Sequence, residues 1–129
     1  MIVGLGVDLF DVPRLEAEVR AADAGVLRAI FTSGEIAACR RHRRPGVGYA
    51  LRFAAKEALV KALGAAAAEG DGLPWRHVHV RLGRAGRHGV VLRGPLKALA
   101  ARRGVGRILL SVTHARGLAA ALVVLESTP

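Results

Sequence analysis

The sequence predicts an α+β fold, in which helices dominate the first half of the chain and strands the second. Residues 47–63 carry the clearest helical pattern, and Gly64 follows them where a glycine cap commonly ends a helix. Residues 78–82 carry the clearest strand pattern, because apolar and polar side chains alternate there. A long helix set between stretches of strand is the order expected of an α+β domain.

The first half opens with a predicted strand at residues 2–9, an apolar run whose two glycines would let another backbone approach closely. Pro13 suits the first turn of a helix that has Leu15 and Val19 on its apolar side. A short apolar turn at residues 26–31 follows. The chain is therefore expected to enter as a strand and to pass directly into helical segments.

The middle of the chain predicts two further helices. Thr32-x-x-Glu35 has the spacing of a capping box, in which each residue caps the backbone N–H of the other. A helix is therefore expected over residues 33–42, ending before Pro45. The long helix at residues 47–63 comes next.

The second half begins with an expected loop at residues 65–74, which glycine and proline punctuate. The strand at residues 78–82 then runs into a glycine-rich turn at residues 83–89. The remaining predicted elements are a strand at 90–92, a helix at 95–104 and two strands at 107–113 and 118–125.

A chain of 129 residues has the size of one domain, which we expect to span residues 1–129. No apolar run reaches the length of a membrane span, and Met1 leads straight into a strand-like segment rather than a signal sequence. We therefore expect a cytoplasmic protein that does not enter a membrane. The one cysteine, Cys39, has no intrachain disulfide partner and is expected to be a small packed residue.

A carboxylate interrupts the apolar face of the long helix. At helical spacing, Tyr49 and Phe53 share that face with Glu57. Lys61 lies one turn beyond Glu57, in the order that favours an ion pair. On spacing alone this can be an ordinary surface pair, which adds only about 0.2–0.5 kcal/mol.

A second isolated carboxylate, Asp8, interrupts the apolar strand at residues 2–9. Two isolated carboxylates, one from a strand and one from a helix, could form an oxygen-rich binding site for a magnesium ion that also binds a phosphate. The functional alternative to a surface ion pair is therefore a Mg²⁺ site built from Asp8 and Glu57.

Three motifs stand in order along the chain. They are Gly4-x-Gly6-x-Asp8, then Arg52-Phe53-Ala54-Ala55-Lys56-Glu57-Ala58 with Lys61-Ala62-Leu63-Gly64, then Ser111-Val112-Thr113-His114 with Ala119-Ala120-Ala121. Together they resemble the motifs of the holo-acyl-carrier-protein synthases, members of the 4′-phosphopantetheinyl transferase superfamily. The resemblance implies an antiparallel sheet packed against the long helix, with one domain per subunit.

The resemblance also implies a reaction, the transfer of 4′-phosphopantetheine from coenzyme A to a serine of an apo acyl carrier protein with release of adenosine 3′,5′-bisphosphate. Asp8 and Glu57 would hold Mg²⁺, and Lys61 would neutralise the transferred phosphate or assist the leaving group. The base for the serine proton is left open between a metal-bound water and a carboxylate of the metal site. The carrier protein is left open between fatty-acid and polyketide synthesis.

The same resemblance implies which residues bind coenzyme A. Its phosphates are assigned to Arg52, Lys56, Arg87 and His114. Gly86, which precedes Arg87, is the glycine of the turn expected near the adenosine end. On its own, a histidine at the end of a strand is more often structural, so the role of His114 depends on the motif that it closes.

Two departures limit what the resemblance implies. The family turn typically reads Gly-Lys-Pro, whereas this chain has Gly86-Arg87-His88. The family often has an Asp-Tyr pair where Gly117-Leu118 stands here. Contacts on the adenine side, and any role of that acid and phenol, are therefore not carried over.

The net charge of +10 predicts an acidic partner. Aromatic residues make up only 4% of the chain and none lies in the densest basic run, residues 40–44, so the stacking surface of a nucleic-acid binder is missing. Acyl carrier proteins are acidic and coenzyme A carries three phosphates, so both can account for the charge. Arg14 and Arg20 on the first predicted helix are assigned to the carrier protein.

Two other functions stay open at this point. One is a basic module that binds nucleic acid or another polyanion, with Asp8 and Glu57 merely structural. The other is a family member that binds coenzyme A without transferring anything. With 52% hydrophobic residues, the chain has more apolar surface than a small monomer readily buries, which predicts an oligomer. The resemblance implies a homotrimer with active sites at subunit boundaries.

Overall fold

The computed structural model of the protein describes residues 1–64 and 74–128. Its helices and strands confirm the α+β prediction. In chain order they are β1 (Ile2–Asp11), α1 (Val12–Ala21), α2 (Ala24–Ile30), α3 (Ser33–Arg41), α4 (Pro45–Leu63), the 3₁₀ turn η2 (Pro74–His77), β2 (Val78–Arg81), the 3₁₀ turn η3 (Arg84–Gly86), β3 (Gly89–Leu92), α5 (Gly94–Arg102), β4 (Val105–Ala115) and β5 (Leu118–Ser127).

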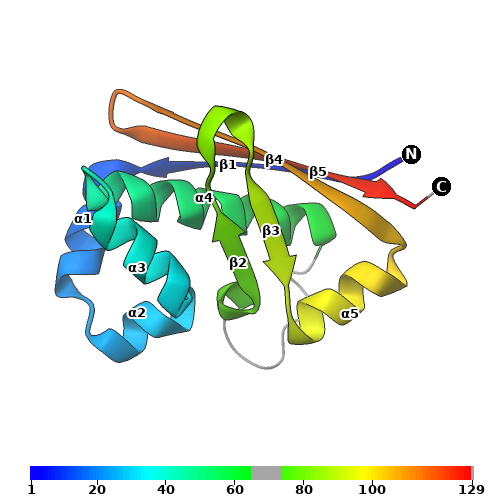
Figure 1. Ribbon diagram of the computed structural model, residues 1–129, viewed down its shortest axis with the longest axis horizontal. Helices are drawn as coiled ribbons and strands as arrows, with labels where there is room; N and C mark the ends of the chain where they lie inside the picture. Colours follow the sequence, from blue (N-terminus) through cyan, green and yellow to red (C-terminus); the bar gives the residue numbers. More distant parts are fainter. Residues whose placement is uncertain (65–73, 129) are drawn as a thin grey trace.

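The main sheet is antiparallel and has the strand order β1-β5-β4. The long helix α4 lies along one face of this sheet (Figure 1). The strand register pairs Ala121 of β5 with Asp8 on one side and with Val112 on the other. Asp8 therefore lies on an edge strand, in the same row of the sheet as these two residues.

β1 approaches α4 more closely than a strand with ordinary side chains could. A Cβ atom added at Gly4 would lie 2.5 Å from the carbonyl oxygen of Ala62, and one at Gly6 would lie closer still to the carbonyl oxygen of Ala58. This confirms the prediction that the glycines of the first strand admit another backbone. Asp8 follows Gly6 by two residues, so it faces the helix as well.

α4 is buried on nearly every side, in keeping with its position between the main sheet and the smaller elements. Alanine is a strong helix former with a small side chain, so Ala54 and Ala58 allow close packing and are fully buried. Gly64 adopts a φ of 65° and caps the helix in the left-handed conformation, as the sequence predicts.

Side-chain caps begin the short helices on one side of α4. Asp11 Oδ1 accepts the backbone N–H of Arg14 at 2.8 Å and so caps α1. Thr32 and Glu35 form the predicted capping box of α3, with bonds of 2.8 and 3.1 Å. The local sequence signals therefore fix where these helices start.

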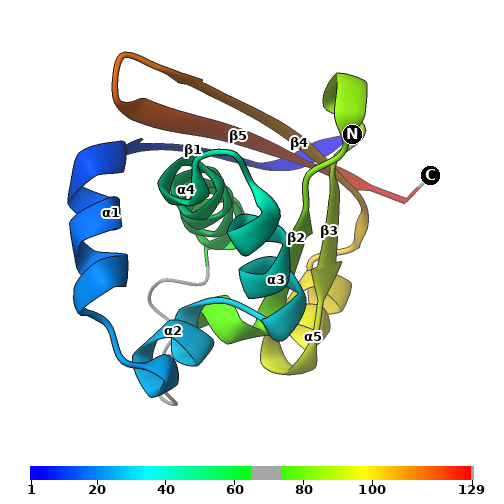
Figure 2. The same cartoon turned by 60° about the vertical axis from the view of Figure 1, so that its left-hand side comes forward.

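A separate hairpin of β2 and β3 forms a two-stranded antiparallel sheet. In Figure 2, α4 is seen nearly end-on, with α1 on one side of it and the hairpin on the other. The turn of the hairpin contains Ala85 and Gly86 at φ of 53° and 72°. α5 follows the hairpin and leads the chain back into the main sheet.

Two apolar clusters make up the core, and α4 contributes to both. Leu59 and Leu125 belong to the cluster between α4, the main sheet and the hairpin. Leu15 and Phe31 belong to the cluster under α1 and α3. A helix shared by both clusters holds the strand and the helices around it in one arrangement.

Two segments differ from the sequence prediction or escape it. Residues 26–31 lie mostly in helix α2 rather than in a turn, because Asp23 caps it by accepting the backbone N–H of Val26 at 2.9 Å. The loop expected at residues 65–74 lies outside the described residues except for Pro74. Within the described part of the chain, no helix is long and apolar enough to cross a membrane.

Candidate active site

Asp8 and Lys61 form an ion pair where β1 crosses α4. Lys61 Nζ lies 2.9 Å from Asp8 Oδ1 and also donates to the carbonyl oxygen of Val7 at 3.3 Å. The Asp8 side chain is 12% exposed and the Lys61 side chain is 52% exposed, so the pair lies at the protein surface. Lys61 thus pairs with the carboxylate of the strand, whereas helical spacing alone also allows a simple pair with Glu57.

Glu57 lies one helical turn before Lys61 and shares this site. Burial raises the pKa of the Glu57 carboxyl above its ordinary value of 4.5, and the neighbouring Asp8 carboxylate raises it further. The indole N–H of Trp75 and the ammonium group of Lys61 lower the same pKa. Two carboxylates that disfavour each other's charge form a site that a cation would stabilise.

The donor set fits a magnesium ion. Asp8 Oδ2 is buried and has no hydrogen-bond partner in residues 1–64 and 74–128. A buried acceptor left in this way costs about 1–3 kcal/mol, which a bound cation would recover. Those residues contain no group of three or more metal-ligating side chains. Mg²⁺ is commonly held by one or two carboxylates while waters and substrate phosphates complete its shell.

Lys56 precedes Glu57 but points into the interior, where its side chain is fully buried. Its Nζ is held by one carboxylate and three carbonyl oxygens, those of Glu35 at 2.6 Å, Ile30 at 2.8 Å, Trp75 at 2.9 Å and Val78 at 2.7 Å. Burial lowers the pKa of Lys56, and the Glu35 carboxylate opposes that shift. No proton is left for a phosphate in this arrangement, which does not favour a contact with coenzyme A, and the assignment of Lys56 to a phosphate stays a prediction.

Arg52 is also buried, but its guanidinium group is only partly used. Its Nη1 donates to the carbonyl oxygen of Gly48 at 3.1 Å, and its Nε has no partner among the described residues. The side chain lies near Cys39, whose pKa burial raises to about 11 against the opposing effect of Arg52. Cys39 is therefore an unreactive packed thiol, and the role of Arg52 at a phosphate stays a prediction.

The turn between β2 and β3 exposes both Gly86 and Arg87. A Cβ atom at Gly86 would meet nothing within 4 Å, so open space lies beside the backbone there. His88 accepts the backbone N–H of Gly83 through Nδ1 at 3.2 Å, which ties its ring to its own turn. Arg87 is thus exposed to solvent and available to an anion, as is Arg84 in the same turn.

His114 lies near the end of β4 and is exposed. The register places it in one row with Ala119 and Phe10, two residues along β1 from Asp8. β5 separates the strand of His114 from the strand of Asp8. The fold of one chain therefore joins Asp8, Glu57 and Lys61, while His114 lies across the sheet from them.

Comparison with known proteins identifies the family. Residues 4–123 match the 4′-phosphopantetheinyl transferase superfamily. The chain belongs to this superfamily. It is 41% identical over 126 residues to the holo-[acyl-carrier-protein] synthase of Frankia casuarinae, with 98% of each chain covered.

Solved structures of related synthases have the same fold as this transferase over nearly the whole chain. The acyl carrier protein synthase of Mycobacterium tuberculosis has a TM-score of 0.74 at 30% identity, covering 99% of this chain and 100% of that chain. The holo-(acyl-carrier-protein) synthase of Bacillus anthracis, solved in complex with CoA (3′,5′-ADP), has a TM-score of 0.74 at 29% identity, with 99% of each chain covered. The resemblance carried by the three sequence motifs is thus confirmed.

An apolar groove of about 390 Å³ lies beside α1 of this transferase. Its walls include Leu15 and Val19 of α1, Val26 and Ile30 near α2, and the rings of Phe53 and Trp75. Phe53 lies one turn before Glu57, so the groove borders the candidate site. Arg14 and Arg20 are exposed on α1, where Arg14 also pairs with Glu18 at 3.2 Å.

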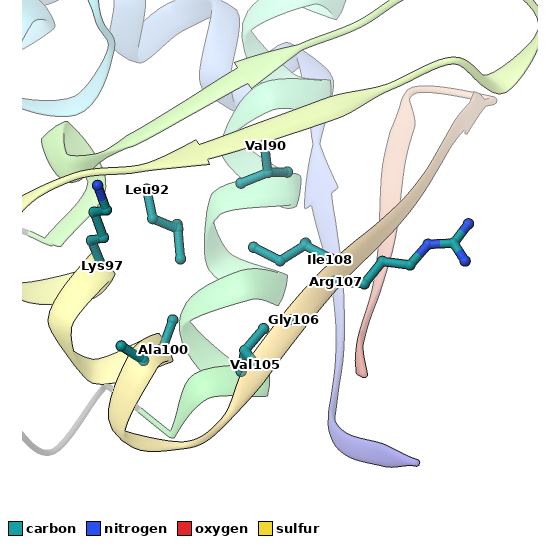
Figure 3. A pocket seen from close by; sticks show the side chains of 9 residues that line it. Val90, Leu92, Lys97, Ala100, Val105, Gly106, Arg107 and Ile108 are labelled. Atoms are coloured by element: carbon teal, nitrogen blue, oxygen red, sulfur yellow. The ribbon is translucent and has the colours of Figure 1, made fainter. Parts of the chain in front are cut away.

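A second cavity, of about 420 Å³, lies between β3, α5 and β4 (Figure 3). Val90, Leu92 and Ile108 form apolar walls, while the guanidinium group of Arg107 extends away from them (Figure 3). Ile108 lies four residues before Val112, which shares the sheet row of Asp8. This cavity is therefore separate from the candidate site.

Sequence reasoning missed two residues beside the site. Trp75 packs against Phe53 with ring centroids 5.3 Å apart and lowers the pKa of Glu57. Glu35 is the buried partner of Lys56. The capping box marks Glu35 as a helix cap but not as an ion-pair partner, and no periodic pattern surrounds Trp75.

Proposed function

We propose that Asp8, Glu57 and Lys61 form the active centre of this holo-acyl-carrier-protein synthase, which transfers 4′-phosphopantetheine from coenzyme A to a serine of an apo acyl carrier protein. The reaction follows from the family. One observation supports the residues, the contact of Lys61 with Asp8 beside the half-buried carboxylate of Glu57. Adenosine 3′,5′-bisphosphate is the second product.

Asp8 and Glu57 are the residues that would hold Mg²⁺. Bound there, the ion would neutralise the pyrophosphate of coenzyme A and stabilise the charge that develops as the P–O bond breaks. Asp8 Oδ2 supports this assignment, because no hydrogen bond from the described residues competes for it. Two protein carboxylates leave most of the coordination shell to phosphate and water.

Lys61 is proposed to neutralise the transferred phosphate or the leaving group. Its ammonium group has three protons, and the described residues offer it two acceptors, on Asp8 and Val7. One N–H therefore stays available to a phosphate oxygen. The serine proton is proposed to pass to a carboxylate of the site or to a metal-bound water.

Gly86, Arg87 and His114 are proposed contacts of coenzyme A, together with Arg52. Because β5 separates His114 from Asp8, we propose that the site combines two subunits. One subunit would supply Asp8 and its neighbours, and the adjacent subunit would supply the turn of Gly86 and the strand end of His114.

The outer face of the main sheet supports assembly. Apolar side chains on this face are exposed to solvent in the single chain, namely Val3, Leu5, Val7, Leu9, Leu109, Leu118 and Leu122. A contiguous apolar surface of this kind marks an interface between proteins. We propose that these sheet faces pack together in a homotrimer, in which the number three comes from the family resemblance.

The acidic carrier protein is proposed to dock on α1. Arg14 and Arg20 would attract its acidic surface, and the apolar groove between α1 and α2 would receive apolar side chains near the reactive serine. The groove ends at Phe53 and Trp75, beside Glu57, so docking there would bring the serine to the site. A cytoplasmic location is proposed from the family alone.

A mass assay tests this function. The protein is incubated with coenzyme A, Mg²⁺ and an apo carrier protein, and the intact mass of the carrier is measured. We expect a gain of one phosphopantetheine group, and a far slower gain with the Asp8→Ala variant. Carriers of fatty-acid and polyketide synthesis are compared in parallel.

Two results would contradict the proposal when binding of coenzyme A and of nucleic acid is measured alongside the mass assay. Binding of coenzyme A without any mass gain across these carriers would identify a coenzyme A-binding relative that lacks transfer activity. Tight binding of nucleic acid without coenzyme A binding would favour a polyanion-binding module.

A further inference from the structure

Trp75, the one tryptophan of the chain, has a polar group that the fold leaves unused. Its indole N–H is buried and meets no hydrogen-bond partner at bonding geometry within the described residues. Buried polar groups are nearly always paired, so one left free beside a candidate site needs an explanation.

Two contacts hold Trp75 beside Glu57. Its carbonyl oxygen accepts a bond of 2.9 Å from Lys56, the residue directly before Glu57 on α4. Its ring packs on Phe53, one helical turn before Glu57, with centroids 5.3 Å apart. The backbone and the ring of Trp75 are therefore both anchored to the turn of α4 that carries Glu57.

Lys56 makes this anchor rigid. The same ammonium group binds Glu35 and two further carbonyl oxygens, so it has no freedom to release Trp75. The indole N–H also lies close enough to Glu57 to lower the pKa of its carboxyl.

We propose that Trp75 is a positioning residue of the metal site, whose indole N–H holds one oxygen of Glu57 and so aims the other oxygen at a cation shared with Asp8. This inference rests on the proposed Mg²⁺ site and adds a donor behind one of its two carboxylates. Hydrogen bonds behind a metal ligand commonly change metal affinity by about 10–100-fold. In this role Trp75 would act on the ligand Glu57 and not on the reacting atoms.

The test separates the ring from its N–H group. Trp75→Phe keeps an aromatic ring on Phe53 and removes the donor, so we expect the dissociation constant for Mg²⁺, measured by calorimetry, to rise about 10-fold. Tyr49→Phe is the matched control, because it also removes a polar hydrogen from an aromatic ring of α4 but lies away from Glu57. We expect its Mg²⁺ affinity to be unchanged.

A second measurement uses the parent protein. A single tryptophan gives one indole N–H signal in a ¹⁵N correlation spectrum, and we expect Mg²⁺ and the Glu57→Gln variant each to shift it. Unchanged Mg²⁺ affinity in Trp75→Phe, or an indole signal insensitive to both changes, would overturn the inference. The Asp8→Asn variant distinguishes a failure of the metal site from a failure of the role of Trp75. If Asp8→Asn loses Mg²⁺ binding while Trp75→Phe binds Mg²⁺ as tightly as the parent, only the role of Trp75 fails. If the parent protein binds no Mg²⁺, the metal site fails and this inference with it.

Discussion

Two lysines of α4 lie little more than one turn apart, and each pairs with a carboxylate from another element: Lys56 with Glu35 of α3 and Lys61 with Asp8 of β1. The Glu35–Lys56 pair, at 2.6 Å, is fully buried on both sides. The Asp8–Lys61 pair, at 2.9 Å, leaves Lys61 half exposed. One pair therefore belongs to the interior and the other to a surface that a substrate can reach.

The bonding of the two pairs shows the same contrast. Both oxygens of Glu35 accept backbone N–H groups, from Thr32 and Val80, and Lys56 has no spare proton. In the other pair, Asp8 Oδ2 has no partner among the described residues. An ion pair whose hydrogen-bonding groups are all used stabilises a fold, whereas a pair with an unused acceptor is suited to bind a ligand.

Replacing the lysine of each pair tests this contrast, and the expected effect on the free energy of unfolding is the largest of those considered. Lys56→Met leaves the Glu35 carboxylate buried without a counter-charge, so we expect the free energy of unfolding to fall by about 3–5 kcal/mol. Lys61→Met removes a half-exposed partner and should change it by no more than about 1 kcal/mol. Urea unfolding followed by circular dichroism measures both. Equal losses in the two variants would show that the pairs do not differ as described.

Removal of a carboxylate at the surface pair tests its chemistry. Asp8→Ala and Glu57→Gln should each leave a folded protein whose transfer rate falls by about 10²-fold or more, because a charge-stabilising group is lost. The rate is measured as the mass gain of the carrier protein over time with Mg²⁺ present. Near-parental activity in either variant would remove that residue from the site.

The pH dependence of the free energy of unfolding tests whether the pKa of Glu57 is raised in the folded protein. Its pKa in the folded protein lies above the ordinary value of 4.5, so folding favours the protonated form. This contribution to stability is present below 4.5 and is lost as the pH rises through the higher folded pKa. Without Mg²⁺, we therefore expect the free energy of unfolding to decrease over that range. The Glu57→Gln variant should show a smaller decrease, and an identical pH profile in both proteins would contradict the shift.

Charge reversal on α1 should have the smallest effect, because Arg14 lies outside both pairs. Arg14→Glu is expected to raise the KM for the carrier protein several-fold and to weaken its salt dependence, with the KM for coenzyme A nearly unchanged. Arg102→Glu, an exposed arginine of α5, is the matched control. If the two variants have the same KM for the carrier protein, the docking surface would instead be assigned to the basic run at residues 40–44.

Much of the fold could be predicted from the sequence because its signals are local. The capping box of Thr32 and Glu35, the terminal Gly64 and the alternation of β2 depend on residues close in the chain. The glycines of β1 gave a long-range prediction, since their missing side chains indicate a close neighbour before that neighbour is known.

The candidate site was only partly predictable, because side-chain direction depends on tertiary packing. Lys56 and Lys61 stand in one motif and have the same chemistry, and only the packing of α4 buries the first and exposes the second. Trp75 reaches Glu57 from a distant part of the chain, which no spacing rule connects to it. Asp8 and Glu57 stood out in the sequence because charges in apolar segments require a reason.

The transfer rates of Lys61→Met and Lys56→Met, measured in single turnovers under conditions where both are folded, test the distinction between the pairs most directly. We expect Lys61→Met to be slower than the parent by about 10²-fold or more. Lys56→Met removes no group of the proposed centre and acts on it indirectly, through contacts such as that with Trp75, so its rate should stay within about 10-fold of the parent. A near-parental rate for Lys61→Met, or a larger loss for Lys56→Met, would contradict the assignment of the Asp8–Lys61 pair to the active centre.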